Sequence, residues 1–499
     1  MLWETLFARS TELAGGHVMF ATCGGRLPIC DAANTHSAPP MPCNSCSEYA
    51  EGALRAAGYT ALKVRDLVDL AAETRLARER IADIRSVSAC EAFTDMDLPI
   101  GRLVRISVAW FLARGSLPDT PAVIETYRGF LVSGQVLARA FAALLDRTRP
   151  DRVFTLNGTF FAERIMLELC RRREVGFTTY ERGFIADTVV VTPGRPAAYL
   201  EVPEAAWAEA AATPLTEAEE HQLDEYLGQR SRGERTLDNY WQRRLEEWTE
   251  VCAELRLDPA RPIVTLFSNI AWDSAVQERD IAFESLAEMV VRSIEGFADR
   301  PDHQLVVRLH PAEIQLGNHP TLERMGALIE AAVKRVPENV RVIPSESAVS
   351  SYTLMSHSAL GLVHSSTVGL EMAVEGIPVV VTGKAHFRGR GFTFDVDSEA
   401  GYWRAIDTLL SDQVSHLDPD QRALARRYAH LFFFRFMQAI PQVVEAGRGR
   451  PRMRLDGGTS IAETPELVRI AGAIVAGTPV VASAGASALD VRPGHVLGE

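Results

Sequence analysis

The chain has 499 residues, of which 47% are hydrophobic and 23% charged, a composition that is ordinary for a globular protein of two or three domains. Its formal net charge of -13 excludes a general electrostatic attraction to nucleic acid or to anionic lipid. Residues 1–4 lack the basic region of a secretory signal, and no apolar region with a cleavage site follows them. We therefore expect a cytoplasmic protein.

One uncharged segment, residues 470–489, has about the length of a membrane span. It consists mostly of Ala, Gly and Ser and contains Pro479. Because small residues contribute little to membrane insertion, the segment predicts a surface helix followed by a loose tail, with no integral membrane span. Peripheral association with a membrane through a partner stays open.

Four of the seven cysteines lie close together in the sequence, with the spacing C-x6-C-x12-C-x2-C. They are Cys23, Cys30, Cys43 and Cys46. Without a secretory signal, a disulfide framework is not expected. Two interpretations remain: a structural zinc or iron–sulfur cluster held by these four thiols, and plain free thiols.

The first half of the chain alternates predicted strands and helices. The strands are predicted at residues 16–22, 151–156 and 176–180, and the helices at 46–57, 67–84, 121–145 and 160–172. Polar residues and glycine follow two of these strands, at Asn157-Gly158 and at Glu181-Arg182-Gly183. Ligands bind at this edge of open α/β sheets, so Glu181 is a candidate general base. Its alternative role is an ion pair with a neighbouring arginine.

A polar helical segment, residues 216–248, separates this half from a second α/β unit. Strands are predicted there at 262–267, 304–309, 340–343, 359–364 and 377–382, and helices at 281–297, 322–336, 347–355, 368–375, 403–410, 418–444 and 465–475. The pattern predicts four regions. They are an N-terminal α/β domain with the cysteine loop (1–215), a helical linker (216–250), a C-terminal α/β domain (251–445) and a final helix with a tail (446–499).

The serine and threonine run after the strand at 359–364 predicts an anion site. Ser365, Ser366 and Thr367 would begin a helix there, so backbone N–H groups, hydroxyls and the positive end of the helix dipole would meet a phosphate. The alternative is an ordinary helix cap. Glu371, one turn further on, is placed to accept hydrogen bonds from a ribose diol.

The loop of residues 383–391 adds positive charge beyond the next strand. It contains Lys384, Arg388 and Arg390 together with His386 and three glycines. Such a loop is able to fold over a phosphate, and its alternative is a solvated turn.

The second half also contains a series of short motifs in a fixed order. They are RLHPAE (308–313), PSE (344–346), SSY (350–352), HSSTVGLE (364–371), GIPV (376–379) and HFRGRGFT (386–393). In order and spacing they resemble the capsule polysaccharide biosynthesis family of bacterial glycosyltransferases. The resemblance implies the GT-B architecture: two Rossmann-like α/β domains that face each other across a cleft, followed by C-terminal helices. The nucleotide-sugar donor would bind the C-terminal domain.

A His-Pro pair and a later Ser-Ser/Thr motif also occur in bacterial transferases that use CMP-activated acidic sugars. By that likeness His310, with Pro311 beside it, would contact the nucleotide, and residues 365–367 its phosphate. The stretch 181–183 resembles the motif that holds the base in bacterial sialyltransferases, with Arg where that motif is acidic. Asp273 is the alternative base. Similar pairs occur in polymerases that transfer glycerol phosphate from CDP-glycerol.

These observations predict a metal-independent glycosyltransferase. It would move a sugar from a nucleotide donor, with CMP as one candidate nucleotide, to a hydroxyl of a surface or capsular glycan or of a lipid-linked acceptor. No cofactor would be required for transfer, and nucleic acid is not an expected partner. The alternatives are a sugar-nucleotide 2-epimerase, a CDP-glycerol-type phosphotransferase of the same architecture, and a non-enzymatic accessory of polysaccharide export.

Overall fold

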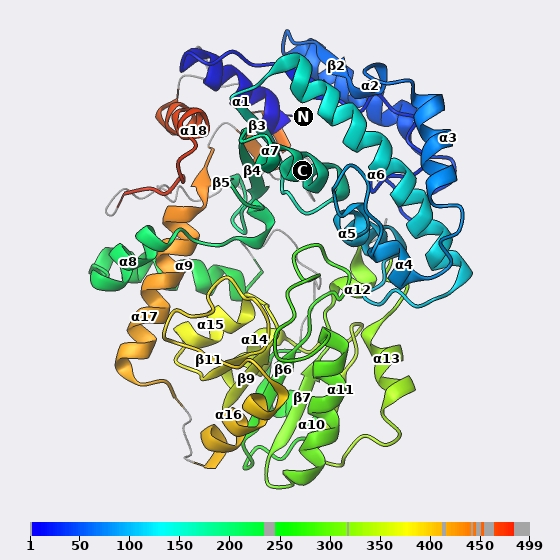
Figure 1. Cartoon of the computed structure of the whole chain (residues 1–499). Helices are drawn as coiled ribbons and strands as arrows, with labels where there is room; N and C mark the ends of the chain where they lie inside the picture. Colours follow the sequence, from blue (N-terminus) through cyan, green and yellow to red (C-terminus); the bar gives the residue numbers. More distant parts are fainter. Residues whose placement is uncertain are drawn as a thin grey trace, which may run out of the picture.

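The computed structural model describes residues 2–233, 245–316, 319–411, 416–440, 443–445, 451–453 and 464–483. Figure 1 shows two α/β halves, with the beginning of the chain (blue to teal) in the upper half and the green to yellow segments in the lower half. The predicted α/β class with two Rossmann-like units is confirmed, because parallel strands joined by helices occur in both halves. The predicted domain boundaries stay a prediction.

The lower half is built on a six-stranded parallel sheet. Its strands are β6 (Ile263–Phe267), β7 (Gln304–Arg308), β8 (Val340–Ile343), β9 (Leu360–Val363), β10 (Val379–Val381) and β11 (Phe394–Asp395). The spatial order is β11-β10-β9-β6-β7-β8, and all neighbouring pairs are parallel. This is the doubly wound Rossmann order, which reverses between β6 and β9. Ligands bind such sheets outside the carboxyl ends of the strands at the reversal.

The helices of the lower half connect these strands. They are α10 (Trp248–Leu255), α11 (Leu286–Gly296), α12 (Ala312–Gln315), α13 (Met325–Ala332), α14 (Ser351–Ser356), α15 (Val368–Val374) and α16 (Glu399–Ser411). Strands β6, β7 and β9 are buried along their whole length. Continuous apolar runs are typical of parallel strands covered on both faces, which is why the sequence predicts them well.

The upper half contains two strand–helix–strand units with parallel strands. In the first, β1 (Phe20–Thr22) and β2 (Ala61–Lys63) flank α2 (Cys43–Ala56). In the second, β3 (Arg152–Leu156) and β4 (Gly176–Arg182) flank α7 (Phe161–Arg172). The remaining elements of this half are α1 (Leu2–Leu13), η1 (Val64–Asp66), α3 (Leu70–Arg80), α4 (Val87–Glu91), α5 (Ile100–Leu112) and α6 (Pro121–Thr148).

The second sheet of the upper half is mixed, with the order β12-β5-β4-β3. The strand β5 (Thr188–Pro193) is antiparallel to β4, and β12 (Gln438–Ala439) returns from the far end of the chain to pair with β5. The helix predicted over residues 418–444 is therefore wrong in its last part. Helix α17 (Pro419–His430) continues as a π-helical turn, η4 (Leu431–Phe436), and the chain then becomes extended because β5 offers it an unpaired edge.

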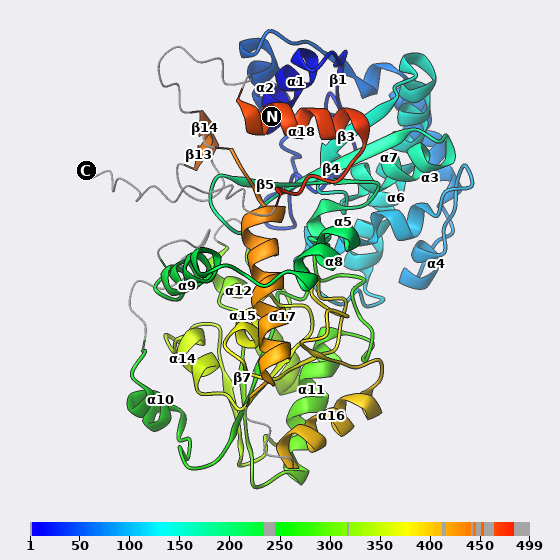
Figure 2. The same cartoon turned by 90° about the vertical axis from the view of Figure 1, so that its left-hand side faces the viewer.

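The predicted helical segment between the halves contains α9 (Glu217–Ser231), preceded by η2 (Ala197–Tyr199) and α8 (Glu204–Ala212). Both α8 and α9 pack against α17, and residues 234–244 lie outside the described part of the chain. Figure 2 shows the last described helix, α18 (Pro465–Ala476), beside α1. The two helices share a buried cluster that includes Phe7 and Ile470. The predicted helix at 465–475 is confirmed, and residues 484–499 lie outside the described part.

The three remaining short elements are η3 (Phe297–Asp299), β13 (Val443–Glu445) and β14 (Pro451–Met453). In the described part of the chain, one helix, α6, is long and apolar enough to cross a membrane, and most of its apolar stretch is buried inside the protein.

The two halves are joined beside the carboxyl end of β6. Trp110 of α5 and Trp272 of the loop after β6 pack edge to face with ring centroids 5.1 Å apart. Arg114 forms an ion pair with Glu323 at 3.0 Å, and Arg164 forms one with Glu278 at 3.0 Å. The contacts of Trp272 and Glu278 fix the loop after β6 against the upper half, and Asp273 belongs to that loop.

Candidate functional site

The carboxyl ends of β6, β7, β9 and β10 collect the polar residues of the lower half. The backbone N–H of His310, after β7, donates to Ser268 Oγ, after β6, at 3.0 Å. The backbone N–H of Gly383, after β10, donates to the carbonyl of His364, after β9, at 2.9 Å. The strand-end residues therefore form one connected layer at the edge where Rossmann sheets bind ligands.

His310 is a neutral imidazole in this layer. Its Nδ1 accepts a hydrogen bond from the Ala312 N–H at 3.1 Å, so the ring proton is on Nε2. Burial, and to a lesser extent the charge of Arg308, lowers the pKa of His310 to about 4. The imidazole is therefore a neutral donor at physiological pH. Pro311 stands at the N-cap of α12 and holds the following turn.

Arg308 lies beneath His310 and is almost completely buried. Its guanidinium donates to the backbone carbonyls of Pro344 at 2.8 Å and Ser347 at 3.1 Å, and burial lowers its pKa to about 10. The partners that the described structure gives it are all neutral. A buried positive charge balanced only by the neutral dipoles of two carbonyls and the Ser351 hydroxyl favours an anionic ligand nearby. The sequence analysis noted Arg308 only as part of a motif.

The two candidate bases belong to different halves of the molecule. Glu181 ends β4, and Asp273 lies in the loop after β6. Burial raises the pKa of Glu181, and repulsion from Asp273 adds to the rise. The Arg182 N–H donates to Glu181 Oε1 at 2.8 Å. Burial also raises the pKa of Asp273, which accepts the Ala275 N–H at 2.9 Å.

Residues 365–367 stand at the beginning of α15, as the sequence predicts. The N-cap is Thr367, and its side chain does not cap the helix, because its backbone is itself helical. The carbonyl of Ser366 accepts the Gly369 N–H at 3.0 Å. All three side chains are half-buried at the edge of the strand-end layer. Phosphate binding by Ser365, Ser366 and Thr367 stays a prediction.

A series of hydrogen-bonded side chains that the sequence analysis missed runs through His364. Its Nε2–H donates to Asp280 Oδ1 at 3.0 Å, so Nδ1 accepts from the hydroxyl of Ser365 at 3.1 Å. His364 is 2% exposed. No sequence signal connects Asp280 to this histidine, because 84 positions separate them and only the sheet brings them together.

Gly383 has no Cβ, and His364 occupies the space that a Cβ at this position would need. A Cβ at this position would lie 2.7 Å from His364 Nε2 and 2.9 Å from the carbonyl oxygen of Arg279. We expect Gly383→Ala to lower the free energy of unfolding by about 1–3 kcal/mol, because the backbone must shift to relieve the overlap. Urea denaturation measures this loss.

The matched control for that substitution is Gly52→Ala within α2. A Cβ there would meet nothing within 4 Å, so alanine should stabilise the helix by about 0.5–1 kcal/mol. Equal stability of the two variants would show that the space at Gly383 is not required.

Glu371 is engaged in a buried ion pair. Its Oε1 lies 2.8 Å from a guanidinium nitrogen of Arg230 in α9, and both side chains are largely buried. A hydrogen bond from Tyr352 to Glu371 contributes, after burial, to a raised pKa of that tyrosine. The predicted contact of Glu371 with a ribose stays a prediction, and it would have to share the carboxylate with Arg230.

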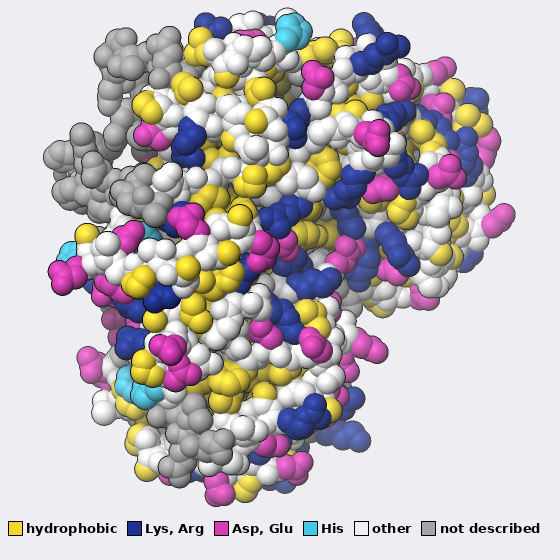
Figure 3. Space-filling model, turned by 60° about the vertical axis from the view of Figure 1, so that its left-hand side comes forward, with side chains coloured by type: hydrophobic (Ala, Val, Ile, Leu, Met, Phe, Trp, Pro, Cys, Tyr) yellow, Lys and Arg dark blue, Asp and Glu magenta, His cyan; other side chains and the backbone are white. Residues whose placement is uncertain are grey.

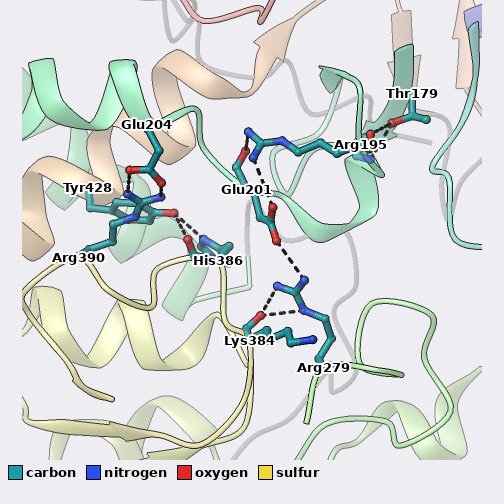
Figure 4. A network of polar contacts seen from close by, with 10 residues as sticks. Thr179, Arg195, Glu201, Glu204, Arg279, Lys384, His386, Arg390 and Tyr428 are labelled. Carbon is teal, nitrogen blue, oxygen red and sulfur yellow. Dashed lines mark hydrogen bonds and ion pairs between the residues drawn. The ribbon is translucent and has the colours of Figure 1, made fainter. Parts of the chain in front are cut away.

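The basic loop is tied down by partners of its own. Arg390 forms two hydrogen bonds with Glu204, at 2.6 and 2.7 Å, and Arg388 donates to the carbonyls of Val381 and Val396 and to Asp397. Figure 4 shows the Arg390 pair in the network around Tyr428. Figure 3 shows Lys and Arg side chains interspersed with Asp and Glu around the boundary between the halves. Phosphate contacts by the two arginines would require these pairs to open.

Lys384 differs from the two arginines because its side chain is exposed. Its Nζ donates to the carbonyl of Glu278 at 3.3 Å, and its own carbonyl accepts from Arg279 Nε at 2.9 Å. Arg279 also pairs with Glu201 at 3.1 Å, as Figure 4 shows. Of the three predicted cations, Lys384 is therefore the one that reaches a ligand at the smallest structural cost.

The four clustered cysteines are free thiols in the structure. The Gly25 N–H donates to Cys23 Sγ at 3.2 Å, and the Arg26 N–H donates to Cys43 Sγ at 3.4 Å. Burial is the main cause that raises the pKa of Cys30 to about 12, and it also raises that of Cys46. Throughout the described residues, no three His, Cys, Asp or Glu side chains are close enough to hold a metal ion. Metal binding by the four cysteines stays a prediction.

Residues 177–416 match the model of the family described as capsule polysaccharide biosynthesis protein. This part of the chain is similar to that family. The match spans just under half of the chain and includes β4 with Glu181, the whole six-stranded sheet, His310 and residues 365–367. The resemblance predicted from the motifs is therefore confirmed for the capsule family, and the match extends into the upper half. Comparison with the curated proteins found no match.

Several solved structures resemble the chain at low similarity. KpsC of Thermosulfurimonas dismutans, a beta Kdo 2,4 transferase, matches at 15% identity and a TM-score of 0.38, over 58% of this chain and 80% of its own. The UDP-GlcNAc 2-epimerase of Neisseria meningitidis matches at 13% identity and 0.28, over 60% and 80%. The glycosyltransferase SnogD of Streptomyces nogalater matches at 14% and 0.25, over 85% and 90%. At these scores the matches carry no argument about activity.

Proposed function

We propose that the protein is a glycosyltransferase that moves a sugar from a nucleotide donor to a hydroxyl of a glycan or lipid-linked acceptor. The observation that supports this most is the connected layer of polar residues at the strand ends that carry His310 and residues 365–367. Carboxylates from two halves would face an acceptor, and neutral donors would face a phosphate. The similarity of residues 177–416 to the capsule family agrees with a glycan product.

In the proposed reaction the acceptor hydroxyl attacks the anomeric carbon of the donor sugar. The new C–O bond forms, the bond to the nucleotide phosphate breaks, and the hydroxyl proton moves to Glu181 or Asp273. The leaving phosphate gains charge, which His310 Nε2–H and the donors at residues 365–367 would stabilise. Arg308 adds a fixed positive potential beneath them. No step consumes a cofactor.

A nucleotide screen tests the donor site. We expect one of CMP, CDP, UDP and GDP to raise the melting temperature, because a ligand at 100 times its Kd stabilises the native state by about 2.7 kcal/mol. His310→Ala and Ser366→Ala should each abolish the shift. CMP is the nucleotide that the motif resemblance favours.

Two outcomes of this screen would contradict the proposal. One is the absence of any shift with protein that is shown to be folded. The other is a shift that persists in both variants, since the nucleotide would then bind elsewhere. Thr192→Val is the control, because the described structure gives the hydroxyl of Thr192 no hydrogen-bond partner and the residue lies in β5, away from the lower sheet.

A sugar-nucleotide 2-epimerase is the second candidate, and two buried carboxyl groups with raised pKa, Glu181 and Asp273, favour it. Epimerisation at C2 removes a proton from one face of the sugar and returns one to the other, a task that suits an acid–base pair. Incubation with a UDP-sugar in D2O without acceptor distinguishes the two. Deuterium at C2 would support the epimerase, and transfer to an acceptor with no exchange would support the transferase.

A further inference from the structure

Asp280 lies at the carboxyl edge of the lower sheet, where the backbone fixes its position. Asp280 and Gly383 form an isolated antiparallel bridge. Beside this bridge, the Lys384 N–H donates to the carbonyl of Arg279 at 2.8 Å. The loop after β6 is therefore attached to the residues that follow β10, and Asp280 stands at the point of attachment.

His364, directly after β9, is enclosed at the same place and is 2% exposed. Its carbonyl accepts the Gly383 N–H at 2.9 Å, and a Cβ at position 383 would lie 2.7 Å from its Nε2. Nε2 lies 3.0 Å from Asp280 Oδ1, and Nδ1 lies 3.1 Å from Ser365 Oγ. The imidazole packs on the backbone of Gly383 and is held between a carboxylate and a hydroxyl.

The imidazole is able to make these two contacts in either of two protonation states. In the neutral state Nε2 carries the proton that Asp280 accepts, so Nδ1 accepts the hydroxyl proton of Ser365. In the cationic state Nδ1 also carries a proton and donates it to Ser365 Oγ. The heavy atoms keep their positions in both states, and only the direction of one hydrogen bond is reversed.

The direction of this hydrogen bond decides what Ser365 offers to a ligand. A hydroxyl has a single proton, so while Ser365 donates to Nδ1 its oxygen presents only lone pairs, which repel an anion. When His364 is cationic, the hydroxyl proton is free to point at the anion, and a positive charge stands behind it. Asp280 supplies the opposite charge that favours the cationic state.

We propose that His364 is a positioning residue that takes up a proton when the phosphate of the nucleotide binds, and so makes Ser365 a hydrogen-bond donor. The proton comes from solvent and bonds to Nδ1. The Ser365 hydroxyl turns from Nδ1 to a phosphate oxygen, and Asp280 balances the new charge. This inference rests on the proposed function, which places the phosphate at residues 365–367.

The charged groups around His364 come from two loops. The loop after β6 contributes Asp280 and Arg279, and the loop after β10 contributes Lys384. Arg279 directs its guanidinium to Glu201, at 3.1 Å, and to the carbonyl of Lys384, and the Lys384 side chain is exposed. Asp280 is the charged group that contacts the imidazole directly.

Further ionisable groups lie one step away on the neighbouring elements. Towards β7, the Ser268 hydroxyl accepts the His310 N–H at 3.0 Å, and burial lowers the pKa of His310 to about 4. On α15, the Glu371 carboxylate is held in its ion pair with Arg230 at 2.8 Å. A substitution at position 364 leaves all of these groups in place, so it isolates the contribution of His364.

Isothermal titration calorimetry in two buffers of different ionisation enthalpy, PIPES and Tris, tests the proposal. The difference between the two heats counts the protons that binding takes up. The titrant is CMP, or whichever of CDP, UDP and GDP raises the melting temperature. At about pH 7.5, the wild type should take up about one proton per nucleotide more than His364→Gln. Glutamine keeps a donor for Asp280 but binds no proton, and the nucleotide's own protonation is common to both proteins.

The pH dependence of affinity has a definite sign. Because the complex holds one more proton than the free protein, the Kd of the wild type should rise with pH, by up to about tenfold per pH unit above neutrality. In His364→Gln only the dependence that belongs to the nucleotide itself should remain.

Two further variants sharpen the result. Asp280→Asn keeps an acceptor beside Nε2 but removes the negative charge, so it should take up fewer protons than the wild type at about pH 7.5. The Asp280 side chain is 34% exposed, so this variant keeps a buried histidine and a folded edge. His221→Gln, at an exposed histidine of α9, is the matched control and should equal the wild type in Kd and in proton uptake.

Equal proton uptake by the wild type and His364→Gln would overturn the proposal. A loss of affinity that is the same at every pH would also overturn it, since that is what a merely structural role of His364 predicts. Nucleotide binding without the difference in uptake would leave the proposed function intact and remove this inference alone. Binding of none of the four nucleotides would remove both.

Discussion

Glu181→Gln is expected to lower kcat for sugar transfer by about 10²–10⁴-fold, the range that a general base contributes. The amide cannot accept the hydroxyl proton, but it keeps the size of the side chain and the hydrogen bond from the Arg182 N–H. Nucleotide binding should persist, because His310 and residues 365–367 belong to the lower half. The expected signature is therefore a loss in kcat with an unchanged melting-temperature shift.

The measurement is a rate assay with the activated form of whichever nucleotide shifts the melting temperature. Asp273→Asn provides the comparison within the pair, and we expect it to lose less activity than Glu181→Gln. Glu125→Gln, an exposed glutamate on α6, is the control and should retain full activity. If Asp273→Asn loses the activity and Glu181→Gln keeps it, Asp273 is the base and the assignment is reversed.

The second large effect is on stability and concerns the buried pair of Arg230 and Glu371. Arg230→Met should lower the free energy of unfolding by about 3–5 kcal/mol, because it leaves the carboxylate of Glu371 buried without its cation. The guanidinium also lies over the rings of Phe184, Tyr226 and Phe433 at 5.8–5.9 Å. Methionine fills much of that space, so most of the loss reports the unpaired charge.

The double variant Arg230→Met/Glu371→Leu separates charge from packing. Removal of both charges leaves no buried ion, so most of the lost stability should return. The exposed pair of Arg324 and Glu346 is the control, since each side chain is at least half exposed and Arg324→Met should cost less than about 1 kcal/mol. A double variant that is as unstable as the single one would show that packing of the guanidinium, and not its charge, holds α9 against α15.

Much of the second half was predictable from local pattern. The strand at 340–343 has the predicted bounds, because three of its four residues are β-branched and apolar and favour an extended chain. His310 and residues 365–367 were found for the same reason, since polar residues directly after such strands must lie at the ligand-binding edge.

The elements missed or misjudged are those defined by distant partners. Strand β12 forms because β5 offers it an unpaired edge. The two strands pair although roughly 250 positions separate them in the chain. The aromatic run in Leu431–Phe436 is compatible with a continued helix. The helix ends there because the run is buried in a cluster to which both halves contribute. Helix propensity is too weak to oppose such packing.

The same division holds for the candidate site. The sequence by itself determined the kinds of groups: a histidine and hydroxyls at strand ends, two candidate carboxylates, and a cation-rich loop. Only the tertiary structure decided how these groups are ionised and which partners they have. It paired Arg230 with Glu371 and Arg390 with Glu204, and it buried Glu181 and Asp273 so that the pKa of each carboxyl is raised. Ionisation and pairing depend on charges within a few ångströms, and such distances between remote segments arise only when the chain is folded.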